Sequence, residues 1–129
     1  MTAEELRQLD DTGYVALPGA IDQAFLEELR REVERLWEEE GENAGSEFRK
    51  EPGARRLANL VDKGEVFERV ISRPQILEAV RHVLGDDFKL SSLNARSTDP
   101  MWADAQPLHC DVGAIADDSG YWVCNTIWL

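Results

Sequence analysis

The sequence predicts an α+β fold in which helices come first and strands follow. Two observations lead to this prediction. Apolar residues recur at steps of three and four in several segments of the first two thirds of the chain. From residue 88 onward, strand-forming segments follow one another without helical spacers. Helices that precede a run of strands are typical of α+β proteins with an antiparallel sheet.

The first two helices have recognisable starts. Residues 2–5 (TAEE) have the form of a capping box, which opens a short helix that ends near Gly13. Asp22 can cap a long second helix, and the charged residues of that helix form a solvated face with i,i+3 and i,i+4 ion pairs. The apolar positions that we expect to pack on the core are Phe25, Leu26, Leu29, Val33, Leu36 and Trp37.

Two shorter helices are expected further along the chain. Residues 66–72 are helical by pattern, and Pro74 suits the first turn of a helix that ends at Gly85. His82 lies off the apolar stripe of that helix, so we expect a solvated histidine and not a metal ligand. Residues 41–56 are rich in glycine and charge and are expected to form a loop.

Four segments have the composition of strands or extended pieces. A turn is expected at residues 116–120, between the last two of them. The four segments are residues 14–17, 88–96, 108–112 and 121–129.

Composition limits the classes of function. The chain has 129 residues, which suits one domain, and 26 Asp and Glu against 14 Lys and Arg give a formal net charge of −12. This balance argues against nucleic acid or an anionic membrane as a partner of a broad basic surface. No apolar run is long enough for a membrane span, and the N-terminus lacks a signal pattern. With only Cys110 and Cys124, a reducing, cytoplasmic setting is the default expectation.

One tripeptide carries candidate chemistry. His109 and Asp111 are two residues apart in a segment expected to be extended, so their side chains share one face and Cys110 lies on the other. An imidazole with a nearby carboxylate supplies two ligands of the facial triad found in non-haem Fe(II) oxygenases. His-x-Asp alone is a weak signal, since a surface pair in a loop looks the same.

Four segments around this tripeptide follow one another in a characteristic order. They are the early segment 13–21 (GYVALPGAI) followed by a charged helix, residues 74–88, residues 106–111 (QPLHCD) and the later segment 123–129 (VCNTIWL). Taken in order, these segments resemble the phytanoyl-CoA dioxygenase family, and the resemblance extends from about Leu9 to Leu129.

The resemblance implies an Fe(II)- and 2-oxoglutarate-dependent oxygenase on a double-stranded β-helix (jelly roll), hydroxylating a C–H bond of a small-molecule substrate. By position, His109 and Asp111 match the first histidine and the carboxylate of the metal site. Gln106 and Asn125 match positions that contact or line the pocket of the cosubstrate 2-oxoglutarate. For these two residues, ordinary backbone hydrogen bonding is an equally good explanation.

The family pattern continues with a second metal-binding histidine and an arginine that binds the far carboxylate of 2-oxoglutarate, and neither is found after Asp111. We therefore expect residues 1–129 to be the N-terminal part of a single dioxygenase domain, with a sheet still incomplete. As such a fragment, the chain is expected to be inactive.

Two other interpretations remain open. A non-catalytic acidic protein could complete its open sheet by pairing residues 121–129 with another chain or with a second copy. A different metalloenzyme, such as a hydrolase, could use His109 and Asp111, but catalytic zinc sites normally have three protein ligands.

Overall fold

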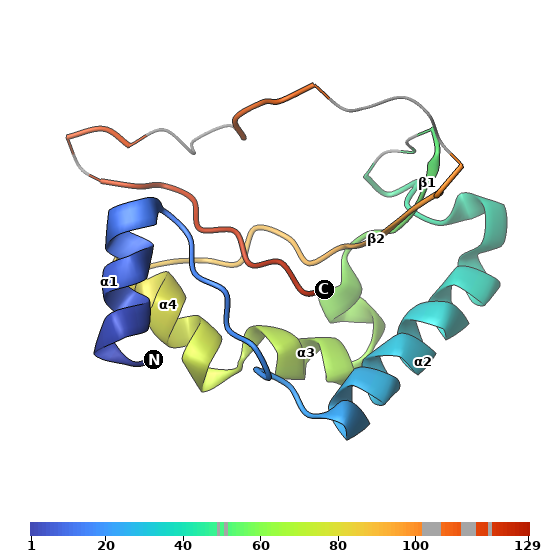
Figure 1. The fold of residues 1–129 in the computed structure, drawn as a ribbon. Coiled ribbons are helices and arrows are strands. Elements are labelled where there is room, and N and C mark those ends of the chain that lie inside the picture. Colours follow the sequence, from blue (N-terminus) through green and yellow to red (C-terminus); the bar gives the residue numbers. More distant parts are fainter. Residues whose placement is uncertain (49, 51, 102–106, 112–115, 119) are drawn as a thin grey trace. The chain divides into compact units, whose positions relative to one another are not determined.

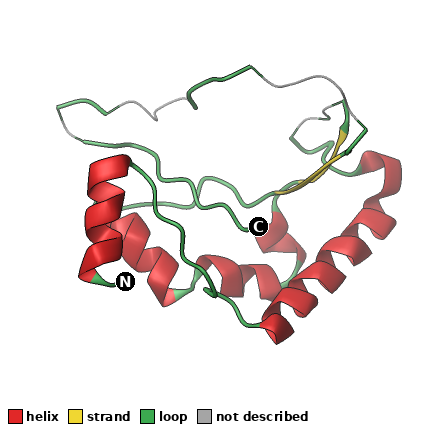
Figure 2. Ribbon diagram, in the orientation of Figure 1, coloured by secondary structure: helices red, strands yellow, loops and turns green. Residues whose placement is uncertain are grey.

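A computed structural model describes residues 1–129 except 49, 51, 102–106, 112–115 and 119. The described residues form four α-helices, two short 3-10 helices and a two-stranded sheet (Figures 1 and 2). They divide into two compact units. The first contains residues 1–20, 71–89 and 107–129, and the second contains residues 21–70 and 90–106. Among the described residues, no helix has the length and apolar character needed to cross a membrane.

The second unit is organised around helix α2 (Gln23–Glu40). The Asp22 side chain accepts a hydrogen bond of 2.8 Å from the backbone N–H of Phe25, so the expected N-cap is confirmed. A 3-10 turn, η1 (Gly41–Asn43), follows directly. Two elements come later in this unit: η2 (Leu60–Lys63) and α3 (Glu65–Ile71), whose last residue belongs to the first unit. The helix expected at residues 66–72 is thus confirmed to within one residue.

The sheet pairs two short strands antiparallel: β1 (Ala54–Leu57) and β2 (Ala95–Thr98). Ala54 lies opposite Thr98, and Leu57 lies opposite Ala95. This pairing confirms an α+β architecture with an antiparallel sheet. It also corrects the expected loop at residues 41–56, which contains η1 and most of β1. The sequence of β1 is too polar to suggest a strand, and the distant partner β2 supplies the hydrogen bonds that make it one.

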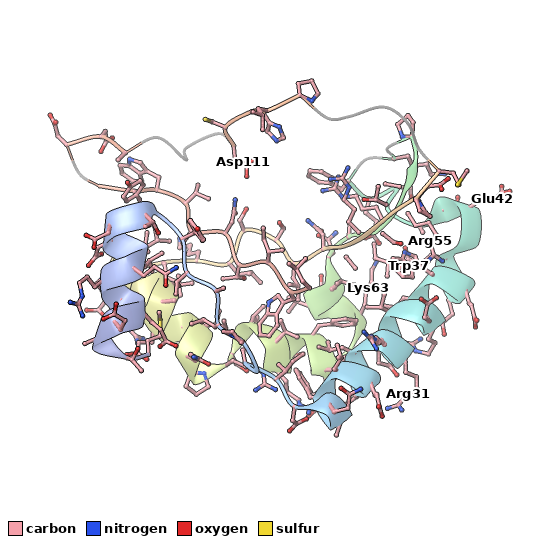
Figure 3. The ribbon with its side chains drawn as sticks, in the orientation of Figure 1. Arg31, Trp37, Glu42, Arg55, Lys63 and Asp111 are labelled. Carbon is pink, nitrogen blue, oxygen red and sulfur yellow. The ribbon has the colours of Figure 1, made fainter. Side chains whose placement is uncertain are left out.

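Strand β1 is held from two sides within the second unit. The Arg55 guanidinium stacks on Trp37 of α2, 4.1 Å from the ring centroid (Figure 3). On the other side, Gly45 adopts φ 76°, and a Cβ there would lie 2.9 Å from the carbonyl oxygen of Arg56. Glycine is therefore required at position 45 for both its conformation and its close approach.

The hydrophobic core lies almost entirely in the second unit. Leu57 is 0% and Phe67 is 1% exposed, and both are large side chains at its centre. The other buried apolar residues of this unit are Phe25, Leu36, Ala58, Leu60, Val66 and Val70. Of the apolar positions expected to pack from α2, Phe25 and Leu36 are fully buried, and the rest are half-buried.

The first unit contains helices α1 (Ala3–Thr12) and α4 (Pro74–Leu84). Thr2 and Glu5 make both hydrogen bonds of the expected capping box. His82 Nε2 of α4 lies 2.7 Å from the Asp10 carboxylate of α1. His82 is exposed, as expected, and the structure adds a contact with a residue 72 positions away that no local pattern predicts.

The expected strands are largely absent from the described residues. Residues 14–17, 108–111 and 121–129 have no strand assignment, Val112 lies outside the described residues, and of residues 88–96 only the last two belong to β2. Ser97 and Thr98, which follow the expected segment, complete that strand. A strand exists only where a second segment pairs with its backbone, and composition alone does not supply the partner.

Lys63 of η2 links this element to α2 and to the segment that follows η1 (Figure 3). Its Nζ donates to Glu40 at 2.7 Å and to Glu47 at 2.9 Å, and its side chain is only 14% exposed. Burial lowers the pKa of Lys63, but the hydrogen bonds to Glu40 and Glu47 outweigh it and raise the pKa above 10.5.

We expect the substitution Lys63→Met to lower the free energy of unfolding by about 1–3 kcal/mol at neutral pH, because it leaves Glu40 half-buried without this partner. A raised folded-state pKa stabilises the fold fully below the unfolded value and loses that effect as the pH rises through the folded value. The difference between wild type and variant should therefore shrink above about pH 10.5 in urea titrations. Lys89→Met, at an exposed position, is the control. A constant difference up to pH 12 would contradict the assignment.

Candidate functional site

The side chains of His109 and Asp111 converge in the first unit. His109 Nε2 lies 3.6 Å from Asp111 Oδ1, and the two side chains are 64% and 55% exposed. The alternation of extended backbone predicts this shared face, and the distance confirms it. Two donor atoms held about 2.1 Å from one octahedral metal ion, at a right angle, are about 3 Å apart. The pair therefore fits two adjacent ligands of one metal after a small side-chain movement.

The backbone carbonyl of Pro107 determines which imidazole nitrogen is available. His109 Nδ1 lies 3.1 Å from this oxygen. A carbonyl oxygen can only accept a hydrogen bond, so Nδ1 carries the proton and donates it. In the neutral ring, Nε2 then holds the lone pair, and Nε2 is the nitrogen that faces Asp111. Sequence inspection misses this contribution because it comes from the backbone and not from a side chain.

A third predicted residue, Asn125, reaches the same place. Its Nδ2 donates a hydrogen bond of 2.8 Å to Asp111 Oδ2. A turn between the two segments reverses the chain, with mutual backbone hydrogen bonds of 3.1 and 3.0 Å between Asp117 and Gly120. Trp122 Nε1 also donates to Asp117 Oδ2 at 2.9 Å and ties the turn to the returning segment. The turn expected at residues 116–120 is thus confirmed, with Ser119 outside the described residues.

Cys110 lies between His109 and Asp111 in the sequence, and Cys124 directly precedes Asn125. Cys110 is exposed, and Cys124 is partly buried. Burial raises the pKa of the Cys124 thiol, which keeps it protonated at neutral pH.

Together, these residues are a candidate for part of a metal-binding donor set. A neutral imidazole and a carboxylate oxygen are suitable ligands for Fe(II), and Asn125 holds the second carboxylate oxygen. Among the described residues, no group of three or more His, Cys, Asp or Glu side chains comes together as a metal site. Gln106, the other residue predicted to contact the cosubstrate, lies outside the described residues.

The other histidine, His82, lies elsewhere in the first unit and contacts Asp10. The chain has only these two histidines, so His109 is the only one at the candidate site.

Comparison with known proteins bears on the resemblance inferred from the sequence. No curated protein and no solved structure matches the chain. A family model described as phytanoyl-CoA dioxygenase (PhyH) does match, and the match covers residues 9–127, nearly the whole sequence. It includes His109, Asp111 and Asn125 in one continuous region with the N-terminal helices. The chain therefore belongs to the phytanoyl-CoA dioxygenase family.

Proposed function

We propose that this chain supplies part of the catalytic centre of an Fe(II)- and 2-oxoglutarate-dependent dioxygenase that oxidises a C–H bond of a small molecule. Family membership supports a dioxygenase-type function. The observation that carries the proposal is the separation of 3.6 Å between His109 Nε2 and Asp111 Oδ1. In this assignment, these two atoms are metal ligands, and the Pro107 carbonyl keeps the imidazole in the ligating tautomer.

The bound metal would supply the binding of 2-oxoglutarate and the activation of O₂. The residues of this chain have simpler tasks. His109 offers a neutral nitrogen donor, and Asp111 offers a negative oxygen donor that partly offsets the charge of the metal. Both side chains are more than half exposed, which leaves room for the remaining ligands on the open side.

We further propose that the centre is completed by residues outside positions 1–129. A facial triad needs a second histidine, and His82 is bound to Asp10. The residues outside positions 1–129 would belong to an additional stretch of polypeptide. An arginine of that stretch would bind the far carboxylate of 2-oxoglutarate. The strands of that polypeptide would complete a double-stranded β-helix. With two protein ligands only, the chain by itself is expected to bind metal weakly and to have almost no activity.

The proposal is tested by two measurements on the 129-residue chain. Incubation with Fe(II), ascorbate and 2-oxoglutarate under air should produce succinate only at the rate of the protein-free control. Titration with Mn(II), followed by ¹H–¹⁵N spectra, should broaden the amide signals nearest His109, Asp111 and Asn125 first. Robust succinate formation would overturn the incomplete-site proposal, and broadening confined to other residues would overturn the assignment of the ligands.

A second candidate function is supported by the exposed apolar side chains of the last segment. Trp122 is 64% and Ile127 is 79% exposed, and residues 121–129 have no strand partner among the described residues. A non-catalytic acidic protein could bury these side chains by strand addition to another chain. Sedimentation velocity distinguishes the two cases when combined with the metal titration. Association without any Mn(II) broadening at His109 would favour the non-catalytic function.

A further inference from the structure

We propose that Asn125 is a positioning residue for the carboxylate of Asp111 and does not contact the cosubstrate, an inference that rests on the proposed metal-binding function. The resemblance to the family suggests a place in the 2-oxoglutarate pocket for this residue. The hydrogen bond that the structure contains points to a different task, because it ends on the candidate metal ligand.

The two oxygens of Asp111 have different neighbours. Oδ2 accepts the hydrogen bond of 2.8 Å from Asn125 Nδ2, and Oδ1 faces His109 Nε2 at 3.6 Å. An unrestrained carboxylate can rotate about its terminal torsion and can bind a metal through one oxygen or both. The amide of Asn125 opposes both movements, since either would lengthen its bond to Oδ2. Oδ1 is therefore the oxygen available to the metal, and it lies on the same side as His109 Nε2.

The chemistry of the donor suits this task. An asparagine amide donates a hydrogen bond without carrying a charge. A lysine or arginine at the same position would neutralise the carboxylate and compete with the metal cation for it. Asn125 thus orients the ligand and leaves its negative charge available. Hydrogen-bond partners of metal ligands commonly contribute tenfold to a hundredfold to metal affinity.

The turn between Asp117 and Gly120 makes the contact available. It reverses the chain, so that the side-chain amide of Asn125 reaches Asp111, which lies 14 residues earlier in the sequence. The bond between Trp122 and Asp117 secures the returning segment three residues before Asn125. Positioning of the ligand is therefore built into the first unit and does not depend on bound 2-oxoglutarate.

The test is metal affinity measured without 2-oxoglutarate, where a residue that only contacts the cosubstrate would have no effect. Free Mn(II) is measured by electron paramagnetic resonance during titration of wild type, Asn125→Ala, Asn125→Leu and Thr126→Ala. The two Asn125 variants should bind Mn(II) about tenfold or more weakly. Thr126 is an exposed neighbour of the same segment, so Thr126→Ala should bind as wild type does.

A metal-free measurement checks the hydrogen bond itself. The side-chain amide signals of Asn125 should shift when Asp111 is replaced by alanine, and those of Asn94, which belongs to the other unit, should not. Equal Mn(II) affinity of wild type and both Asn125 variants would overturn the positioning role and leave the proposed function standing. Failure of wild type to bind Mn(II) at His109 would overturn both. Circular dichroism verifies that the variants, which alter an exposed residue, remain folded.

Discussion

Replacing His109 with alanine is expected to abolish metal binding by this chain. The substitution removes the only imidazole at the candidate site and leaves the Asp111 carboxylate as the one proposed ligand. Metal affinity should fall by roughly 100-fold or more, because the loss of a ligand has a larger effect than the loss of a residue that only supports a ligand. Asp111→Ala should have a comparable effect, since it removes both the second donor and the partner of Asn125.

The second histidine supplies a matched control. His82→Gln retains a side-chain donor that can bond to Asp10 and should leave metal affinity unchanged. Isothermal titration with Co(II) or Mn(II), together with paramagnetic broadening, measures both variants against wild type. If His109→Ala and His82→Gln bind metal equally well, the metal site lies elsewhere. If His82→Gln alone weakens binding, the assignment of the two histidines must be exchanged.

The second large effect is expected on stability. Phe67 of α3 is 1% exposed, and we expect Phe67→Ala to lower the free energy of unfolding by about 3–5 kcal/mol. The loss combines the transfer free energy of the ring with the cavity it leaves among the other core residues. Small domains have total stabilities of about 5–15 kcal/mol, so the second unit could lose most of its folded population.

Phe48 makes a suitable control for Phe67 because it is the same residue type in the same unit. Its side chain is 59% exposed, and the Arg56 guanidinium lies 4.6 Å from the centroid of its ring. Phe48→Ala should therefore lower the free energy of unfolding by no more than about 1 kcal/mol. Urea unfolding followed by circular dichroism measures both variants. Similar midpoints for the two variants would show that Phe67 does not hold the core together.

Sequence reasoning succeeded where a structure depends on neighbouring residues. Thr2 and Asp22 cap their helices through backbone groups within three positions, and Pro74 occupies the first turn of α4. The shared face of His109 and Asp111 is equally local, since extended backbone alternates its side chains. The succession of these pieces also indicated the family, which the match over residues 9–127 confirms.

Strands were the weak part of the prediction, for a physical reason. Residues 121–129 are rich in strand-forming side chains yet have no strand assignment, whereas the polar stretch of β1 pairs with β2. Backbone hydrogen bonds between strands need a partner from a distant part of the chain. Composition measures how well a residue fits such a pairing and not whether the pairing occurs.

By itself, the sequence determined the helices, the α+β class and the family, and it singled out His109 and Asp111 as the ligands that we propose. Each of these depends on contacts between close neighbours or on an ordered set of motifs. The tertiary structure decided the pairing of β1 with β2, the contact of His82 with Asp10 and the position of Lys63 between two glutamates. It also brought Asn125 to Asp111 across 14 residues. These contacts depend on how the chain folds back on itself, because the entropy of closing each loop is offset only by packing and hydrogen bonds that no local pattern records.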